Sequence, residues 1–168
     1  MNFEIDSVLP LLEVERGNGK KVVLVTCTFD VPNPSDFEFL TYAKQQGDIL
    51  IVGINQDSFV VQMKGRGRPV LTQDVRAQMV VNLKPVNFVF YSWGNKFETT
   101  AHIKPDVVIF NNSDAKSRYA EKRKDKVEKL QTAFPNISIL VYNDEGKYVD
   151  DEQLIKKIKQ LPKTKKQP

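Results

Sequence analysis

The sequence holds very few of the side chains that build disulfides and metal centres. Its 168 residues include one cysteine, Cys27, and one histidine, His102. A single cysteine excludes an internal disulfide and a cysteine-based zinc site. No apolar run approaches the roughly 20 residues that cross a membrane, and the first six residues lack the basic and apolar regions of a signal peptide. We therefore expect a cytoplasmic protein without a membrane segment.

The positive net charge of +4 comes mainly from the end of the chain. Residues 156–168 contain six lysines and no acid, so the remainder is slightly acidic. One interpretation is that this basic tail binds nucleic acid or an acidic partner. The other is a solvated tail, which the absence of aromatic residues for stacking bases favours.

Short apolar runs alternate with helical patterns along the chain. Five strands are expected at 22–25, 49–54, 88–91, 107–110 and 137–142. Helices are expected from a cap at Ser35 or Asp36, at 57–63, from Thr72 to Pro85, at 97–103, at 113–134 and at 150–161. Strands and helices that alternate in this way call for a parallel sheet with both faces covered. The sequence predicts an α/β fold with a Rossmann-like, doubly wound parallel sheet of five strands.

Three parts of the chain are expected. Residues 1–19 form an N-terminal arm, in which Pro10 starts a short helix and Gly17 ends it. Residues 20–161 form the α/β domain, and residues 162–168 form a basic disordered tail. Within the domain, Val75, Met79, Val80 and Leu83 are expected on one apolar helix face.

Residues 21–40 are where such a sheet binds its ligand. A β-branched run ends at Val25, a turn-rich loop follows, and a helix starts near Ser35. The first N–H groups of that helix point toward an anion bound at the end of the strand.

The same stretch resembles a known family. Residues 28–30 (Thr-Phe-Asp), two further residues and the box 33–36 (Asn-Pro-Ser-Asp) look like the first motif of the cytidylyltransferase-like nucleotidyltransferases. Further matches in the same order are 47–57, 64–69, 74–77 and 105–108, and together they span roughly residues 10–115. The loop 64–69 is similar to the branch that contains the nucleotidyltransferase domains of ADP-heptose synthase and glycerol-3-phosphate cytidylyltransferase.

The resemblance implies a reaction, a cofactor and partners. The family transfers a nucleotidyl group from a nucleoside triphosphate to a phosphorylated small molecule and releases pyrophosphate. It therefore implies a nucleotide or sugar phosphate ligand, magnesium bound with the triphosphate, and a homodimer.

The sequence departs from the family at the positions that carry the family's chemistry. Its box reads His-x-Gly-His, and here Asn33 and Asp36 stand in place of the two histidines that donate hydrogen bonds to phosphate. Losing one such donor costs on the order of a hundredfold in rate. Cys27 replaces a glycine, the loop 110–114 lacks the family's lysine, and acids occupy 150 and 151 where hydroxyls are expected. Each change brings bulk, fewer donors or more negative charge.

Seven residues remain as candidates for nucleotide or phosphate binding: Thr28, Phe29, Asp30, Lys64, Arg66, Arg68 and Arg76. For the basic residues the alternative is a solvated loop and, for Arg76, a salt bridge on the helix surface. Asp30 either holds substrate hydroxyls or metal, or caps a turn. For Asn33 and Asp36 a turn and a helix cap are favoured over catalysis.

Three hypotheses follow. The first is a nucleotidyltransferase-like pseudoenzyme that binds a nucleotide or phosphorylated metabolite, with transfer weak or lost. The second in rank is a non-catalytic interaction module, RNA-associated through the tail. The third is an active nucleotidyltransferase in which a metal and the arginines replace the histidines.

Overall fold

A computed structural model describes residues 2–112, 120–144, 148, 149 and 151–161. The strands in this part of the chain are β1 (Val22–Cys27), β2 (Ile49–Asn55), β3 (Phe88–Ser92), β4 (Val107–Asn111) and β5 (Ser138–Tyr142). They pair in parallel in the order β3-β2-β1-β4-β5. The expected Rossmann-like α/β fold with a doubly wound parallel sheet is confirmed.

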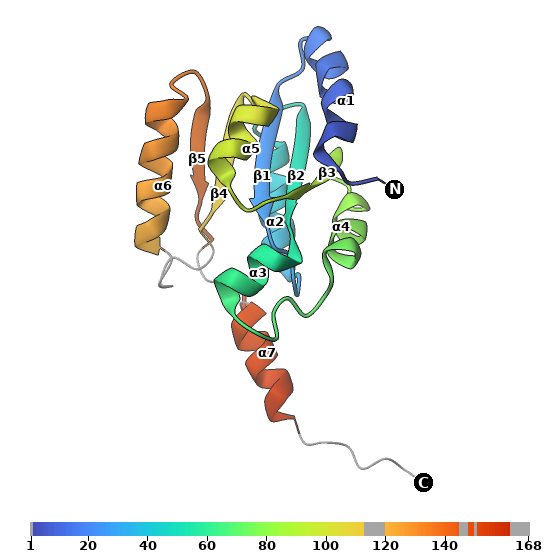
Figure 1. Ribbon diagram of the computed structural model, residues 1–168, viewed down its shortest axis with the longest axis vertical. Helices are drawn as coiled ribbons and strands as arrows, with labels where there is room; N and C mark the ends of the chain where they lie inside the picture. Colours follow the sequence, from blue (N-terminus) through green and yellow to red (C-terminus); the bar gives the residue numbers. More distant parts are fainter. Residues whose placement is uncertain (1, 113–119, 145–147, 150, 162–168) are drawn as a thin grey trace.

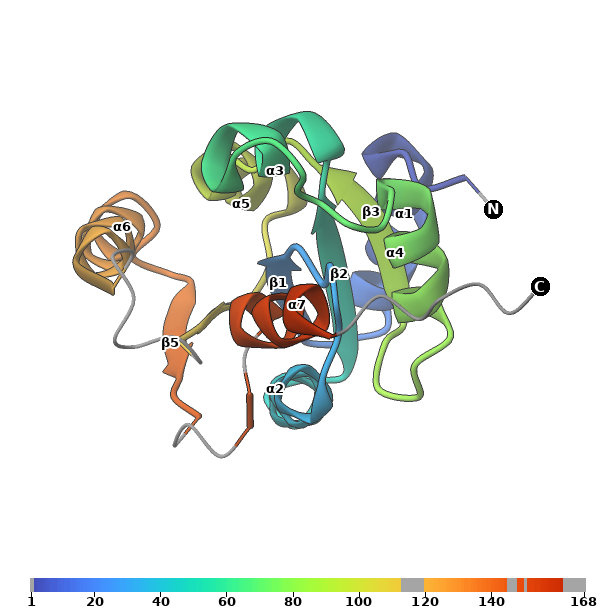
Figure 2. The same ribbon diagram turned by 90° about the horizontal axis from the view of Figure 1, so that it is seen from below.

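The helices surround this sheet. They are α1 (Ile5–Gly17), α2 (Pro34–Lys44), α3 (Asp57–Lys64), α4 (Gln73–Val81), α5 (Lys96–Ile103), α6 (Ala120–Ala133) and α7 (Asp151–Gln160). Helix α2 lies on one side of the sheet, and α5 and α6 lie on the other (Figure 2). Helix α7 extends away from the edge where the strands end (Figure 1).

Two apolar layers hold the helices onto the sheet. Alternate residues of β1 point to opposite faces, so Val23 and Val25 pack with α2 and α4, while Val22 and Leu24 pack with α1, α5 and α6. All four side chains are fully buried. Because both faces are covered, the strands read as continuous apolar runs, which is the signal that made them predictable.

The first helix differs from its prediction. It begins at Ile5, and Pro10 lies inside it instead of starting it. Proline removes one helical hydrogen bond. Three side chains of this helix, Ile5, Val8 and Leu12, are buried against the sheet, and their burial outweighs the missing bond. The division of the chain at residues 19 and 161 stays a prediction.

The predicted apolar face of α4 is wrong at Val75. That side chain is 44% exposed, and the buried side of the helix consists of Arg76, Ala77 and Val80. The periodicity was shifted by one residue because a fully buried arginine was not expected.

Two further predictions concern segments that lie partly or wholly outside the described residues. The long charged helix is described as α6 from Ala120 to Ala133, and its expected start at 113–119 lies outside them, as does the tail 162–168. Among the described helices, none has the length and apolar character needed to cross a membrane.

Gly94 provides a test of the packing at the ends of the strands. Its φ is +80°, and an added Cβ would lie 2.3 Å from the ring of Phe59 in α3. We expect Gly94→Ala to lower the free energy of unfolding by about 2 kcal/mol or more. Gly17→Ala, at a site with no atom within 4 Å, should change it by less than about 0.5 kcal/mol. Urea denaturation of both variants measures the difference, and equal effects would contradict this packing.

Candidate functional site

The candidate site lies where the parallel strands end. Strands β1 and β4 pair side by side, but their successors lie in opposite directions along the sheet. Their last paired residues are Val25 and Ile109, and both strands run two residues further, to Cys27 and Asn111. This is the switch point of a doubly wound sheet, where such folds bind ligands.

The box at 33–36 caps helix α2. The side-chain oxygen of Asn33 accepts the Ser35 N–H at 2.8 Å, and an oxygen of Asp36 accepts the Asn33 N–H at 3.0 Å. Asn33 is therefore the N-cap, in place of the Ser35 or Asp36 cap expected from the sequence, and Pro34 takes the first helical position. The side-chain oxygens of Asn33 and Asp36 serve this helix end.

Negative charge gathers at this helix start. The pKa of Asp36 is raised to about 6, mainly by burial and also by the nearby charges of Asp151 and Asp144, against the lowering effects of the Asn33 N–H and of Lys64. Asp144, which follows β5, also accepts a hydrogen bond from the hydroxyl of Ser35. The acids come from three separate segments and meet near the end of β1. They oppose a second anion unless one of them is protonated or moves.

Asp30 holds the turn that follows the glycine loop. It is 2% exposed. One carboxylate oxygen accepts the backbone N–H groups of Val70 at 2.6 Å and Leu71 at 2.9 Å, and the other lies 2.6 Å from Nε of Arg68. Of the two interpretations made from the sequence, this geometry matches the carboxylate that fixes a turn, here between distant segments.

Lys64 and Arg68 converge on one carboxylate. Nζ of Lys64 lies 2.9 Å from Oδ2 of Asp151, at the start of α7, and Nη2 of Arg68 donates to the same oxygen. Burial tends to raise the pKa of Asp151, but the charges of Lys64 and Arg68 hold it below its usual value. The two cations thus already bind an anionic oxygen, which the chain itself supplies.

Arg76 is fully buried, so it does not form a salt bridge on the helix surface. Nη1 donates to the Thr28 carbonyl at 2.6 Å and Nε donates to the Leu71 carbonyl at 3.0 Å. Nη2 donates to the Asn55 carbonyl at 2.8 Å and to the carboxylate of Asp57 at 2.6 Å. One guanidinium thus ties the ends of β1 and β2 to α3 and to the turn before α4.

The remaining predicted residues separate into buried and exposed ones. Phe29 is 5% exposed and has a φ of +50°, and the Thr28 hydroxyl accepts the Asn55 amide at 3.4 Å. Arg66 is exposed between Gly65 and Gly67, and within the described residues it has no hydrogen bond or ion pair. The structure therefore brings Asp30, Lys64 and Arg68 together and leaves Arg66 apart. The binding roles of all seven residues stay predictions.

Sequence reasoning missed two residues at this edge. Asp144 and Lys96 follow β5 and β3, and the position of an ionisable residue just after a parallel strand was the available signal. Lys96 is partly buried, and its Nζ lies 4.0 Å from the centroid of the Phe110 ring. The thiol of Cys27 lies in the same region, and burial raises its pKa to about 12, so it stays protonated at neutral pH.

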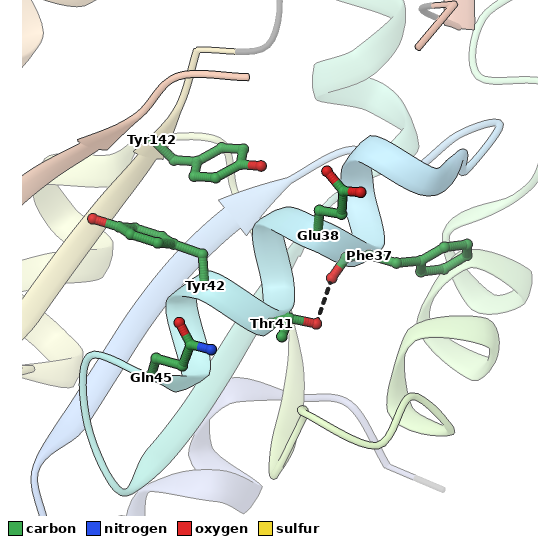
Figure 3. A pocket seen from close by; sticks show the side chains of 6 residues that line it. All are labelled: Phe37, Glu38, Thr41, Tyr42, Gln45 and Tyr142. Atoms are coloured by element: carbon green, nitrogen blue, oxygen red, sulfur yellow. Dashed lines mark hydrogen bonds between the residues drawn. The ribbon is translucent and has the colours of Figure 1, made fainter. Parts of the chain in front are cut away.

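A shallow hollow of about 340 Å³ lies elsewhere, on the outer side of α2 beside β5 (Figure 3). Its lining consists of Phe37, Glu38, Thr41, Tyr42, Gln45 and Tyr142. The rings of Tyr42 and Tyr142 lie 5.1 Å apart at its edge. None of the predicted site residues takes part in it, so the hollow does not define the candidate site.

Replacing Arg76 should strongly lower the stability of the fold. Arg76→Met leaves three buried carbonyl groups without their donor and the Asp57 carboxylate without its cation. We expect the free energy of unfolding to fall by about 3–5 kcal/mol. Arg66→Met, in the exposed glycine loop, should change it by less than about 0.5 kcal/mol. Denaturation of both variants checks this, and a small loss for Arg76→Met would mean that water replaces its contacts.

The raised pKa of Asp36 makes a pH-dependent prediction. The folded state holds this proton more tightly than the unfolded state, so ionisation removes stability as the pH rises from about 4 through 6. Asp36→Asn should therefore be about 1–2 kcal/mol more stable relative to the native chain at pH 7.5 than at pH 4. The asparagine oxygen can still accept the Asn33 N–H. Asp125→Asn, on the exposed face of α6, is the control variant. A pH-independent difference for Asp36→Asn argues against the buried carboxylate.

Comparisons with known proteins identify relatives of this domain. No protein-family profile matches the chain. It is 36% identical over 112 residues to the bifunctional protein HldE of Campylobacter jejuni and 36% identical over 92 residues to that of Aliarcobacter butzleri. These matches cover 65% and 54% of this chain but only 24% and 19% of those proteins. The chain thus spans about a quarter of the length of the curated relatives it matches.

A solved structure shares the fold. The lipopolysaccharide core biosynthesis protein of Thermoplasma volcanium superposes with a TM-score of 0.60 at 24% identity, over 73% of this chain and 96% of that one. At this identity the likeness establishes the fold alone. Together with the sequence relatives, it confirms the resemblance found in the motifs. The chain is therefore a homologue of the HldE proteins with a cytidylyltransferase-like nucleotidyltransferase fold.

Proposed function

We propose that this domain binds a nucleotide or a phosphorylated metabolite where the strands end, and that its nucleotidyl transfer is weak or lost. The observation that carries the proposal is the convergence of Lys64 and Arg68 on a single oxygen of Asp151. Two cations aimed at one anionic oxygen are arranged as they would be for a phosphate oxygen. The carboxylate of Asp151 occupies the place that such an oxygen would take.

The free energy needed to displace the Asp151 carboxylate limits the affinity for a phosphate group. A phosphate reaches Lys64 and Arg68 only when the Asp151 carboxylate gives up both contacts, so part of the binding free energy is spent on breaking them. Asp151 is the first residue of α7, a helix with no buried side chain. Little apolar packing therefore opposes its movement, and exchange between carboxylate and phosphate is feasible.

The loss of transfer follows from the box at α2. Transfer requires preorganised donors that stabilise charge on the phosphates in the transition state. Asn33 and Asp36 instead accept hydrogen bonds from the backbone of their own helix end. The charges of Asp36 and Asp144 at this helix start disfavour the extra negative charge of the transition state.

In this proposal, a magnesium ion enters the site only when it is bound to the triphosphate. Among the described residues, no group of three or more histidine, cysteine, aspartate or glutamate side chains is placed to hold a metal ion. A magnesium ion would then be held mainly by phosphate oxygens, as is usual for this ion. Titrations with and without magnesium distinguish this case from metal-free binding.

Two proposals concern macromolecular partners. A homodimer is implied by the family resemblance alone. Binding of nucleic acid or of an acidic protein by the tail rests on its six lysines, of which three lie in α7 and three lie beyond Leu161, outside the described residues. Both belong to the alternative in which the domain is a non-catalytic interaction module.

The test is a titration with CTP, ATP and a hexose phosphate, with and without magnesium, followed by calorimetry and thermal unfolding. A ligand at about 100 times its Kd should raise Tm by about 5–10 °C. Lys64→Ala should weaken binding about tenfold or more, because it removes one charged contact. Exposed Lys84→Ala is the matched control and should bind as the native chain does.

Asp151→Asn sharpens the test in the opposite direction. It keeps the size of the side chain and removes the competing charge, so it should tighten phosphate binding. The absence of binding by any of the three ligands at millimolar concentration overturns the proposal and favours the interaction module. Steady release of pyrophosphate from CTP or ATP with a sugar phosphate present overturns the statement that transfer is weak or lost.

A further inference from the structure

Lys96 places an ammonium group at the switch point of the sheet. It is the first residue of α5. Its Nζ lies 3.4 Å from the carbonyl oxygen of Ile109 and 4.0 Å from the centroid of the Phe110 ring. Ile109 is the last residue of β4 that pairs with β1. The ammonium therefore lies where the two strands separate.

Among the described residues, no carboxylate forms an ion pair with the Lys96 ammonium. In the described part of the chain, every ion pair involves other residues. The ammonium group of Lys96 contacts one backbone carbonyl and one aromatic ring, and these contacts offset its positive charge only in part. Lys64 and Arg68 differ in this respect, because Asp151 and Asp30 already pair with them.

The surroundings add positive charge. The pKa of Lys96 is lowered to about 8, mainly by burial and also by the charges of Lys126 and Arg123, against the effect of Cys27. The Cys27 thiol stays neutral at neutral pH because its own pKa is about 12. Lys96 is therefore still mostly protonated at pH 7, and the charges that act on it most strongly, after its burial, include those of Lys126 and Arg123.

The end of β4 holds a second cation in this region. Arg123 of α6 donates to the side-chain oxygen of Asn112, and the amide of Asn112 donates to Asn143 at 2.6 Å. This chain of contacts fixes the guanidinium near the strand ends of β4 and β5. An anion at Lys96 would feel both charges, in a partly desolvated place where a charged contact is strong.

We propose that Lys96 binds a phosphate group of the ligand at the ends of β1 and β4, and that it is the principal anion-binding residue of this domain. The inference rests on the proposed function, since it concerns the same strand ends. Lys96 lies outside the family motifs. The ligand proposed for it carries a phosphate group that lies next to the end of β4. A phosphate there displaces no carboxylate, whereas a phosphate at Lys64 and Arg68 displaces Asp151.

Both cation sets belong to one region. The charges of Lys96 and Lys64 both act on the thiol of Cys27, at the end of β1. A ligand with a polyphosphate, or with two phosphates, can therefore reach Lys96 and then compete for Lys64. Such a ligand should bind more tightly than a monophosphate of the same sugar.

The experiment uses inorganic pyrophosphate and CTP as probes. Lys96→Gln should weaken the binding of both about tenfold or more, as expected for the loss of one charged contact. Lys96→Arg keeps the charge and should retain most of the affinity. Exposed Lys84→Gln is the control and should bind as the native chain does.

Two readouts separate binding from a structural role. In NMR spectra of lysine labelled at Cε, saturating pyrophosphate should raise the pKa of Lys96 from about 8 toward 10.5. Without ligand, Lys96→Gln should have a Tm equal to or above that of the native chain, because an unbalanced partly buried charge lowers stability. A structural lysine predicts a lower Tm and an unchanged pKa.

The outcomes distinguish the two proposals. If Lys64→Ala weakens CTP binding and Lys96→Gln does not, the inference about Lys96 is wrong and the proposed function stands. If pyrophosphate and CTP bind while the pKa of Lys96 stays near 8, the inference is likewise wrong. If the native chain binds neither probe at millimolar concentration, both proposals fail.

Discussion

The strand ends of this protein depend on one buried guanidinium. Arg76 donates hydrogen bonds to three backbone carbonyls from three separate segments and to the carboxylate of Asp57. A fully buried cation is tolerated only when its donors are satisfied, so the loops must keep the positions that satisfy them. The fixed loop after β1 places Asp30, and Asp30 in turn holds Arg68 and the turn at Val70. The geometry of the candidate site thus depends on the contacts that Arg76 makes within the chain.

The second constraint is electrostatic balance. Most motif cations at the strand ends are neutralised by acids of the same chain, as Asp30 and Asp151 neutralise Arg68. Two further acids, Asp36 and Asp144, lie where the resemblance implies donors to phosphate. The domain keeps the parallel sheet and several of the cations that the resemblance implies, while Asn33 and Asp36 accept hydrogen bonds from their own helix end. In the proposed function, binding requires the Asp151 carboxylate to move, whereas transfer would require hydrogen-bond donors to phosphate at positions 33 and 36.

The sequence predicted the sheet well because parallel strands are short, apolar and bounded by turn residues, as in 49–54 after Gly47 and Asp48. The sequence was a weaker guide to the hydrogen bonds between side chains and backbone groups. The cap of α2 was placed two or three residues late, because Asn33, Ser35 and Asp36 are all good caps by type. The burial of Arg76 has no local signal, since its partners are mainly carbonyl groups, which every residue carries. Pairs such as Ser35 with Asp144 join residues more than a hundred positions apart, and only the order of the strands brings them together.

The distribution of unbalanced charge decides where a ligand is first recognised. At Lys64 and Arg68 a phosphate replaces an existing ion pair, so the net gain is the difference between two similar interactions. At Lys96 the proposed anion would meet a cation whose polar contacts within the described residues are a carbonyl and a ring, so nearly the whole interaction would count toward binding. In the proposed site, the β4 side is therefore the stronger half, although the family motifs lie on the other half. The motif residues reflect the relationship to the family, whereas the pairing of charges in the folded chain is what the proposal about Lys96 uses to choose between the two halves.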